Sequence, residues 1–143
     1  MKVQIKLIDD TLPLPEYQTS GAVAFDLYSR IDLEIPAKSI AKIPTNLIVQ
    51  TPPGYLLSIV TRSSTASKKG LSLLQGYGII DQDYCGPTDE ILYQVYNFTD
   101  APVTIERGER VGQAAFLRVD QAEWEQVPEM TRPNRGGFGT TGK

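Results

Sequence analysis

The sequence predicts an all-β fold of the sandwich, jelly-roll or barrel type. Short segments in which polar and apolar residues alternate follow one another along the chain, and 12 glycines and 10 prolines interrupt them at short intervals. Many short strands separated by regular turn signals are typical of these folds. No segment carries the long apolar stripe of a helix, and 143 residues suit one domain that buries a core without disulfide or metal.

Two groups of segments are expected to form strands. Alternation places the apolar side chains on one face in residues 3–7, 31–35 and 103–105. Segments richer in β-branched or aromatic residues, expected to be more buried, are 47–49, 55–60, 91–96 and 114–119. Turns are expected at 52–54, 86–87 and 107–109, and short helical turns at 63–69 and 121–126.

The composition changes near the C-terminus. From Thr131 the chain reads TRPNRGGFGTTGK, with four glycines, two arginines and one aromatic residue. This stretch has too little apolar surface to pack as an ordinary strand. We therefore expect the folded β-sheet domain over residues 1–130 and a mobile arm over residues 131–143.

The chain has no histidine and one cysteine, Cys85. These counts exclude a histidine-dependent catalytic triad, a structural zinc site and an intrachain disulfide. A general base must be a carboxylate, a lysine, a tyrosine or a bound water. The net charge of -3 argues weakly against nucleic-acid binding, and no apolar run approaches the roughly 18 residues that span a membrane. We expect a soluble protein of the cytoplasm or another intracellular compartment, with no nucleic-acid or membrane partner.

Two polar motifs suit contacts with phosphate. Arg62, Ser63 and Ser64 follow an apolar strand, and a guanidinium with hydroxyls at such a junction suits phosphate oxygens. The alternative is structural, because Ser63 or Ser64 can cap the helical turn that follows. Gln113 lies where a turn beginning at Gly108 enters a strand, and it can donate to a phosphate or only satisfy its neighbours.

Residues 76–87 combine glycines, an apolar pair and two carboxylates. Asp81 directly follows the apolar pair, and a carboxylate beside apolar residues can be partly desolvated and oriented to activate a water. The alternative is an ordinary hairpin in which Asp81 and Asp83 are turn residues.

The C-terminal segment 137–143 matches most of a phosphate-binding P-loop, but it lacks the Ser or Thr and the helix that follow the lysine. Its glycine amides can still form an anion-binding nest, to which Arg132 and Arg135 add charge. Phe138 is an aromatic residue between glycines that can stack on a base. The alternative is a disordered tail.

In order along the chain, AFDL (24–27), RSS (62–64), GIIDQDY (78–84), GERVGQ (108–113) and GGFGTTG (136–142) resemble the five motifs of the trimeric dUTPases, the deoxyuridine triphosphate nucleotidohydrolases. The resemblance runs from about Leu12 to the end. It implies a distorted jelly-roll β-barrel in a homotrimer, with active sites between subunits and the C-terminal arm as a lid over a neighbour's site. It also implies that dUTP is hydrolysed to dUMP and pyrophosphate with Mg²⁺, which limits uracil in DNA and supplies dUMP for dTMP synthesis.

The resemblance implies a role for each matched residue. Asp81 is expected to be the general base that orients water for attack at the α-phosphate, and Tyr84 to pack against the deoxyribose and exclude a 2′-hydroxyl. The residues expected to read or adjoin the uracil are Gln75, Gly78, Ile79, Ile80, Leu92 and, by stacking, Phe138. The expected phosphate ligands are Arg62, Ser63, Ser64, Gln113, Gly139 and Thr140. Asp26 is expected to organise the site through water, while the triphosphate and waters hold Mg²⁺ without direct protein ligands.

The chain departs from the family pattern in three places. Ala24 stands where the first motif usually has glycine, and residues 87–89 extend the loop before Glu90. Pro133 stands where the fifth motif usually has arginine. Arg132 or Arg135 must therefore take that place at phosphate, and Arg132 is favoured because Pro133 can redirect its side chain.

Two other functions fit parts of this pattern. A dCTP deaminase shares the fold but needs a catalytic glutamate on the strand after the third motif, where Glu90 is the only acidic residue nearby. The other is a trimer that regulates an additional protein partner, with or without hydrolysis. The extension at residues 87–89 is the surface expected to meet such a partner.

Overall fold

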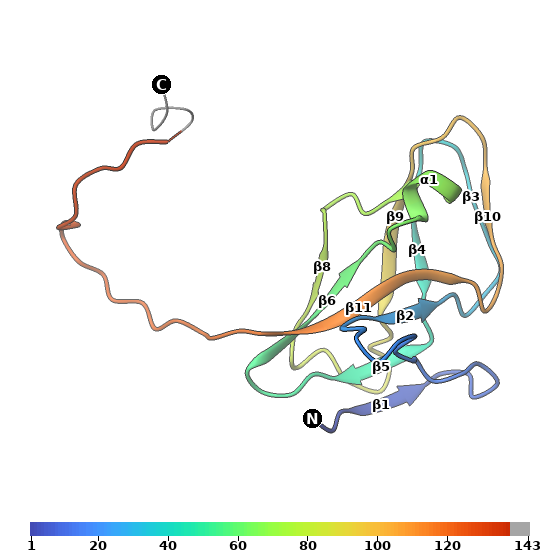
Figure 1. Ribbon diagram of the computed structural model, residues 1–143, viewed down its shortest axis with the longest axis horizontal. Coiled ribbons are helices and arrows are strands. Elements are labelled where there is room, and N and C mark those ends of the chain that lie inside the picture. The colour runs from blue at the N-terminus through green and yellow to red at the C-terminus, as the bar shows by residue number, and fades with distance from the viewer. Residues whose placement is uncertain (138–143) are drawn as a thin grey trace.

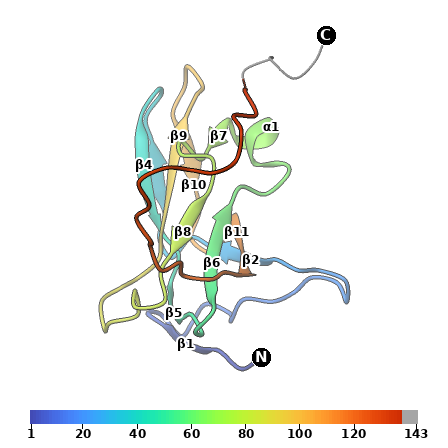
Figure 2. The ribbon, with the colours of Figure 1, turned by 90° about the vertical axis from the view of Figure 1, so that its left-hand side faces the viewer.

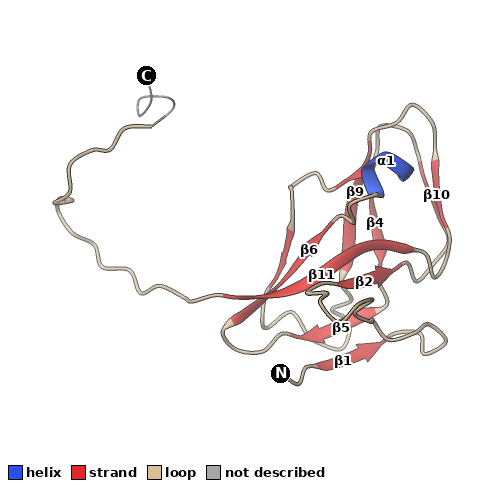
Figure 3. Ribbon diagram, in the orientation of Figure 1, coloured by secondary structure: helices blue, strands red, loops and turns tan. Residues whose placement is uncertain are grey.

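The computed structural model describes residues 1–137, which consist mainly of short strands and their connections (Figures 1 and 3). Its strands are β1 (Gln4–Leu7), β2 (Phe25–Tyr28), β3 (Leu33–Ile35), β4 (Ile40–Pro44), β5 (Leu47–Gln50), β6 (Tyr55–Val60), β7 (Leu71–Ser72), β8 (Gly78–Ile80), β9 (Leu92–Asn97), β10 (Val103–Ile105) and β11 (Arg110–Arg118). Helix α1 (Thr65–Lys69) lies between β6 and β7. No helix in the described part of the chain is long and apolar enough to cross a membrane.

The strands pair antiparallel, and the largest sheet has the order β2-β11-β6-β8. A second sheet has the order β4-β9-β7, and the pairs β1-β5 and β10-β3 complete the jelly-roll barrel. β11 pairs with β2 on one edge and with β6 on the other. Motifs that are far apart in the sequence therefore meet in one sheet.

Apolar side chains from both of the larger sheets fill the interior. Leu27 and Leu57 come from the four-stranded sheet, and Ile43 and Val95 from the three-stranded sheet; all four are fully buried. Burying a side chain of this size contributes about 1.5–3 kcal/mol relative to leaving it exposed. Asp26, on β2, is also buried and is the one charged residue among the buried residues of the described range 1–137.

The expected strands are all present, with ends shifted by a few residues. β2, β4, β7 and β8 have no counterpart among the expected strands, and each is five residues or shorter. The helical turn expected at 63–69 is confirmed as α1. The one expected at 121–126 is wrong, because this segment is exposed and has no packing face that would stabilise so short a helix.

Beyond β11 the chain leaves the body of the molecule as an extended segment (Figure 1), which Figure 2 shows in front of the barrel because that view faces the side to which it projects. Residues 119–137 form no helix or strand and are almost entirely exposed, and the Trp124 side chain is 93% exposed. The barrel elements thus end at Arg118, before the boundary expected at residue 130. Three predicted site residues, Phe138, Gly139 and Thr140, lie outside the described residues.

Candidate active site

Two strand edges without partners border one cavity. β8 is the last strand of its sheet, so one of its edges pairs with β6 and the other is free within the described residues. β9 pairs along one edge with β4, whereas β7 covers its other edge only at Tyr96 and Asn97. The backbone near Leu92 is therefore unpaired on the side away from β4. Strand edges of this kind offer free N–H and C=O groups.

The cavity has a volume of about 450 Å³, within the range of small-molecule sites. Six predicted site residues line it: Gln75, Gly78, Ile79, Ile80, Tyr84 and Leu92. The structure thus brings together the residues expected to contact the base and the sugar, apart from Phe138, which lies outside the described residues. Leu92 keeps its expected place even though residues 87–89 lengthen the preceding loop.

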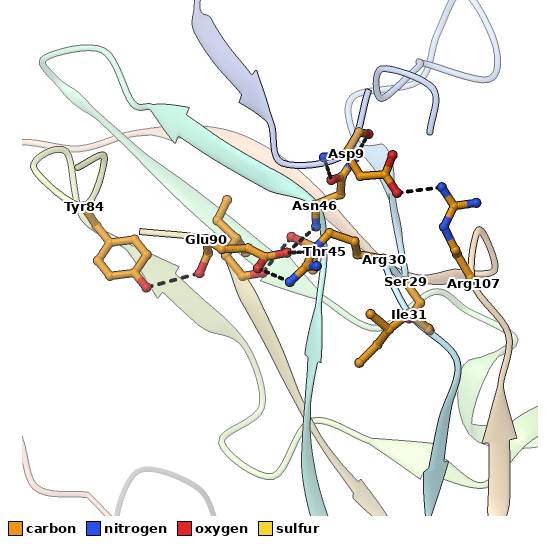
Figure 4. A network of polar contacts seen from close by, with 10 residues as sticks. Asp9, Ser29, Arg30, Ile31, Thr45, Asn46, Tyr84, Glu90 and Arg107 are labelled. Carbon is orange, nitrogen blue, oxygen red and sulfur yellow. Dashed lines mark hydrogen bonds and ion pairs between the residues drawn. The ribbon is translucent and has the colours of Figure 1, made fainter. Parts of the chain in front are cut away.

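Tyr84 is held by a hydrogen bond to the end of its own loop. Its hydroxyl donates to the main-chain oxygen of Glu90 at 3.2 Å, and its side chain remains 39% exposed (Figure 4). The ring therefore has a fixed anchor at its tip and a face available to a ligand.

Asp81 directly follows β8 and lines a neighbouring cavity of about 540 Å³. The two cavities share Ile79. Asp81 is exposed, so the expected partial desolvation is not met within one chain. In residues 1–137 the Asp81 carboxylate has no ion-pair partner, which leaves both oxygens able to accept.

A second cluster surrounds Asp26, whose side chain is 7% exposed. Arg62 Nε lies 2.9 Å from Oδ1, and Arg110 Nη1 lies 3.2 Å from Oδ2. Gln113 on β11 is the register partner of Asp26 on β2 and of Val60 on β6. Two guanidiniums around one carboxylate leave a net positive charge, which suits a polyanionic ligand.

Arg110 is a member of this cluster that the sequence analysis does not single out. The register of β11 against β2 shifts between Arg110 and Gly112. In a regular strand the odd spacing of Arg110 and Gln113 would send their side chains to opposite faces. One extra residue in a bulge reverses that alternation. The side chains of Arg110 and Gln113 can therefore lie on the face of the sheet that carries Asp26.

Ser63 and Ser64 lie at the start of α1. Ser64 occupies the N-cap position, but its hydroxyl makes no capping hydrogen bond. The amide of Thr65 instead donates to the main-chain oxygen of Arg62 at 3.0 Å. The interpretation of these hydroxyls as helix caps is therefore wrong for this structure.

Arg132 and Arg135 are not brought to either cluster by this chain. Both are exposed in the extended segment 119–137, which projects from the barrel (Figure 1). The cavity between β8 and β9 is not lined by Arg62 or Asp26 either. One chain therefore holds the predicted residues in separate groups.

The donor groups do not form a metal cage. Residues 1–137 contain no cluster of three or more Cys, Asp or Glu side chains able to hold an ion. Both oxygens of Asp26 already face arginines. This arrangement fits an ion held mainly by a polyphosphate ligand and water.

Glu90 is committed to a structural contact. Arg30 donates to both of its carboxylate oxygens, at 2.8 and 2.9 Å (Figure 4). Glu90 does not line the cavity between β8 and β9. A catalytic glutamate for deamination would have to face the base, so this placement disfavours the deaminase alternative.

Comparison with known proteins gives the same family from sequence and from structure. The dUTPase family model matches residues 10–142. A deoxyuridine 5'-triphosphate nucleotidohydrolase of Dictyoglomus turgidum is 40% identical, and the alignment covers 99% of each chain. The crystal structure of dUTPase from Streptococcus mutans has a TM-score of 0.77 at 35% identity, covering 84% of this chain and 98% of that one.

Two phage proteins share the fold at lower identity. The Staphylococcus bacteriophage 80alpha dUTPase with dUPNHPP has a TM-score of 0.87 at 23% identity, covering 99% of this chain and 98% of that one. A mutant of the dUTPase from phage phi11 of S. aureus, whose structure shows the coordination of a structural Mg(II) ion, has a TM-score of 0.80 at 21% identity, covering 90% of this chain and 98% of that one. From the family match and the identity over its whole length, the chain belongs to the dUTPase family.

Proposed function

We propose that the cavity between β8 and β9 binds the uracil of dUTP, that Tyr84 packs against the deoxyribose, and that Asp81 activates the attacking water. As a member of its family the chain hydrolyses dUTP to dUMP and pyrophosphate. The proposal assigns the steps of that reaction to residues.

The pair of free strand edges carries the proposal. A pyrimidine edge presents alternating donors and acceptors, and free backbone N–H and C=O groups can match them as a pairing base does. Gly78, Ile79 and Ile80 supply one edge, and the chain near Leu92 supplies the other. Gln75 lies beside them in the lining.

The Asp26 cluster is the proposed phosphate site. Arg62, Ser63, Ser64 and Gln113 would contact phosphate oxygens, and Arg110 joins them because it shares the Asp26 carboxylate with Arg62. Positive groups and N–H donors stabilise charge that develops on phosphoryl oxygens during transfer. Asp26 would keep the two guanidiniums oriented.

Mg²⁺ is the proposed cofactor, coordinated mainly by the triphosphate and water. When bound, it neutralises charge on the phosphoryl oxygens. Asp26 would meet the ion through water, because its own oxygens hold Arg62 and Arg110.

Asp81 is the proposed general base. Its carboxylate would accept a proton from a water molecule while the water oxygen attacks the α-phosphorus in line with the leaving pyrophosphate. The new bond between the water oxygen and the α-phosphorus stays in dUMP. The bond between the α-phosphorus and the oxygen that bridges to the β-phosphorus breaks, and that oxygen leaves with pyrophosphate. The accessible carboxylate of Asp81 beside the base cavity supports this role.

The segment after β11 is proposed to act on a neighbouring subunit of a homotrimer. It leaves its own barrel with Trp124 almost fully exposed, which supports a docking partner outside the chain. From there Arg132 and Arg135, with Phe138, Gly139 and Thr140, would cover the neighbour's nucleotide. Desolvation of Asp81 would then come from the assembled trimer.

Pyrophosphate release from a panel of deoxynucleoside triphosphates in H₂¹⁸O tests the assignment. We expect turnover with dUTP far above that with dCTP or dTTP, without ammonia release, and the ¹⁸O label in dUMP. Label in pyrophosphate would place the attack at the β-phosphate and contradict the proposed geometry. Ammonia from dCTP would support the deaminase alternative.

A further inference from the structure

Glu90, at the end of the loop between β8 and β9, is held by Arg30 and by the amide of Asn46, and we call these contacts the clamp. Arg30 Nε donates to Oε1 at 2.8 Å and Arg30 Nη2 donates to Oε2 at 2.9 Å. The amide of Asn46 also donates to Oε1, at 2.8 Å. The Glu90 side chain is 13% exposed and that of Arg30 is 29% exposed. A two-point contact between a planar guanidinium and a carboxylate fixes both side chains more tightly than a single bond does.

The other side of this clamp is anchored to the turn between β4 and β5. Asn46 has φ 71°, a left-handed conformation that asparagine tolerates better than most residues. Its side chain accepts from the Asp9 amide at 2.7 Å and donates to the Asp9 main-chain oxygen at 2.9 Å. The Thr45 hydroxyl donates to the main-chain oxygen of Ile91 at 2.7 Å. Glu90 (Figure 4) and Ile91 are therefore fastened to Asn46 and Thr45, which are both buried.

Tyr84 depends on this clamp for its own position. Its hydroxyl donates to the main-chain oxygen of Glu90 at 3.2 Å, and its ring lines the cavity with Leu92. Because the acceptor is the backbone of the clamped residue, a shift of Glu90 moves the point to which the ring is tied. Of the other hydrogen bonds that residues 81–89 make within the described part of the chain, only one leaves the loop, from the Gln82 side chain to the main-chain oxygen of Tyr55 at 3.0 Å, and Tyr84 and residues 87–88 are exposed.

We propose that Arg30 and Glu90 are positioning residues that set sugar selectivity by fixing the Tyr84 ring. This inference rests on the proposed contact between Tyr84 and the deoxyribose. A ring excludes a 2′-hydroxyl only if it cannot retreat by the width of one oxygen atom. Loss of the clamp frees the ring and admits a ribonucleotide, while Asp81 and the phosphate cluster stay in place.

The test measures kcat/KM for dUTP and for UTP in matched variants. Arg30→Met removes the guanidinium at similar volume, Glu90→Gln weakens the two-point contact, and Tyr84→Phe removes only the hydroxyl. Lys69→Met is the control, because it breaks a pair to Glu109 of 2.8 Å with side chains 38% and 25% exposed, away from this loop. Tyr84→Ala establishes whether the ring itself discriminates.

Arg30→Met is expected to lower the dUTP-to-UTP selectivity ratio about tenfold, the effect of losing one well-placed hydrogen bond. The change comes from a rise in kcat/KM for UTP, with kcat for dUTP changed less than about threefold. Arg30→Lys restores part of the ratio, and Lys69→Met leaves it at the wild-type value. As a single substitution, Tyr84→Phe is expected to lower the selectivity ratio. In the Arg30→Met background it is expected to lower the ratio no further, because both changes remove the restraint that fixes the Tyr84 ring.

An unchanged ratio in Arg30→Met or Tyr84→Phe, with a lowered ratio in Tyr84→Ala, overturns the inference and leaves the sugar contact standing. An unchanged ratio in Tyr84→Ala instead overturns the proposed sugar contact. If Arg30→Met does not fold, Tyr84→Phe decides the outcome, because it leaves the ion pair intact.

Discussion

At the scale of single residues, three buried or partly buried carboxylates of this barrel are paired with arginine. Asp26 faces Arg62 and Arg110, and Glu90 is paired with Arg30. Asp9, near the end of β1, is paired with Arg107 at 2.7 Å. A charge taken from water is tolerated when such a partner and hydrogen bonds replace the solvent.

Asp9 gives a prediction for acid stability. Hydrogen bonds from the Thr11 hydroxyl and from Arg107 hold the pKa of the Asp9 carboxyl well below its ordinary value of 3.8. A carboxyl pKa that is lower in the folded than in the unfolded protein adds to the free energy of unfolding. This contribution is complete above the pKa of the unfolded state and is lost as the pH falls toward the pKa of the folded state. We expect Asp9→Asn to be less stable than wild type at neutral pH, with the difference shrinking below about pH 4.

Urea unfolding at fixed protein concentration, from pH 7 to pH 2.5, measures this difference. Asp10→Asn removes the same charge at the exposed neighbouring position and is the matched control. A difference between wild type and Asp9→Asn that stays constant, or grows, toward low pH would show that these contacts do not lower the Asp9 pKa.

At the scale of elements, β11 connects the core to the phosphate cluster. Its bulge beside Arg110 lies one residue from Gly112, which faces β9. A Cβ at Gly112 would lie 2.9 Å from Cε2 of Tyr93 and 3.0 Å from its Cζ. Tyr93 is fully buried, and burial raises the pKa of its hydroxyl. The absence of a side chain at Gly112 is what lets this ring fit.

Gly112→Ala is therefore expected to destabilise the fold by about 1–3 kcal/mol, the cost of overpacking a filled core. In a Tyr93→Leu background the same substitution is expected to cost much less, because the clashing ring atoms are gone. Urea unfolding of the four chains forms a double-mutant cycle. Equal costs in the two backgrounds would mean that the Tyr93 ring does not determine the requirement for glycine.

The sequence predicts elements better than it predicts pairings. Alternation and β-branched content reveal strands such as residues 55–60 and 103–105, because burial on one face leaves that imprint. β7 has only two residues, and the three residues of β8 are a glycine followed by two adjacent apolar residues, so neither strand shows alternation. Motifs identify Asp26 and Arg62 as candidate site residues, but the contact of Arg110 with Asp26 depends on a β-bulge. The pairing of Arg30 with Glu90 joins residues 60 positions apart.

At the scale of the whole molecule, one chain leaves its proposed active site incomplete. Asp81 is exposed, and Arg132 and Arg135 lie on a segment that leads away from the barrel. A site assembled from separate subunits accounts for both facts, because the segment that leaves one barrel is available to another.

Mixed trimers test this sharing. Chains truncated after Met130 keep Asp81 but lack the arm, and Asp81→Asn chains keep the arm but lack the base, so each alone is expected to be nearly inactive. Co-refolding equal amounts is expected to restore on the order of a quarter of wild-type activity, because half the sites keep Asp81 and half of their neighbours supply an arm. No recovery would indicate that the arm serves the site of its own chain.

The most direct test of the account is the turnover of Asp81→Asn with dUTP. Asparagine keeps the shape of the side chain but cannot accept the proton at neutral pH. We expect kcat to fall by roughly 10²–10⁴-fold with dUTP binding, measured by calorimetry, close to wild type. Asp83→Asn, on the same exposed loop, is the control and should keep its turnover. Near-normal turnover of Asp81→Asn would contradict the assignment of Asp81 as the base.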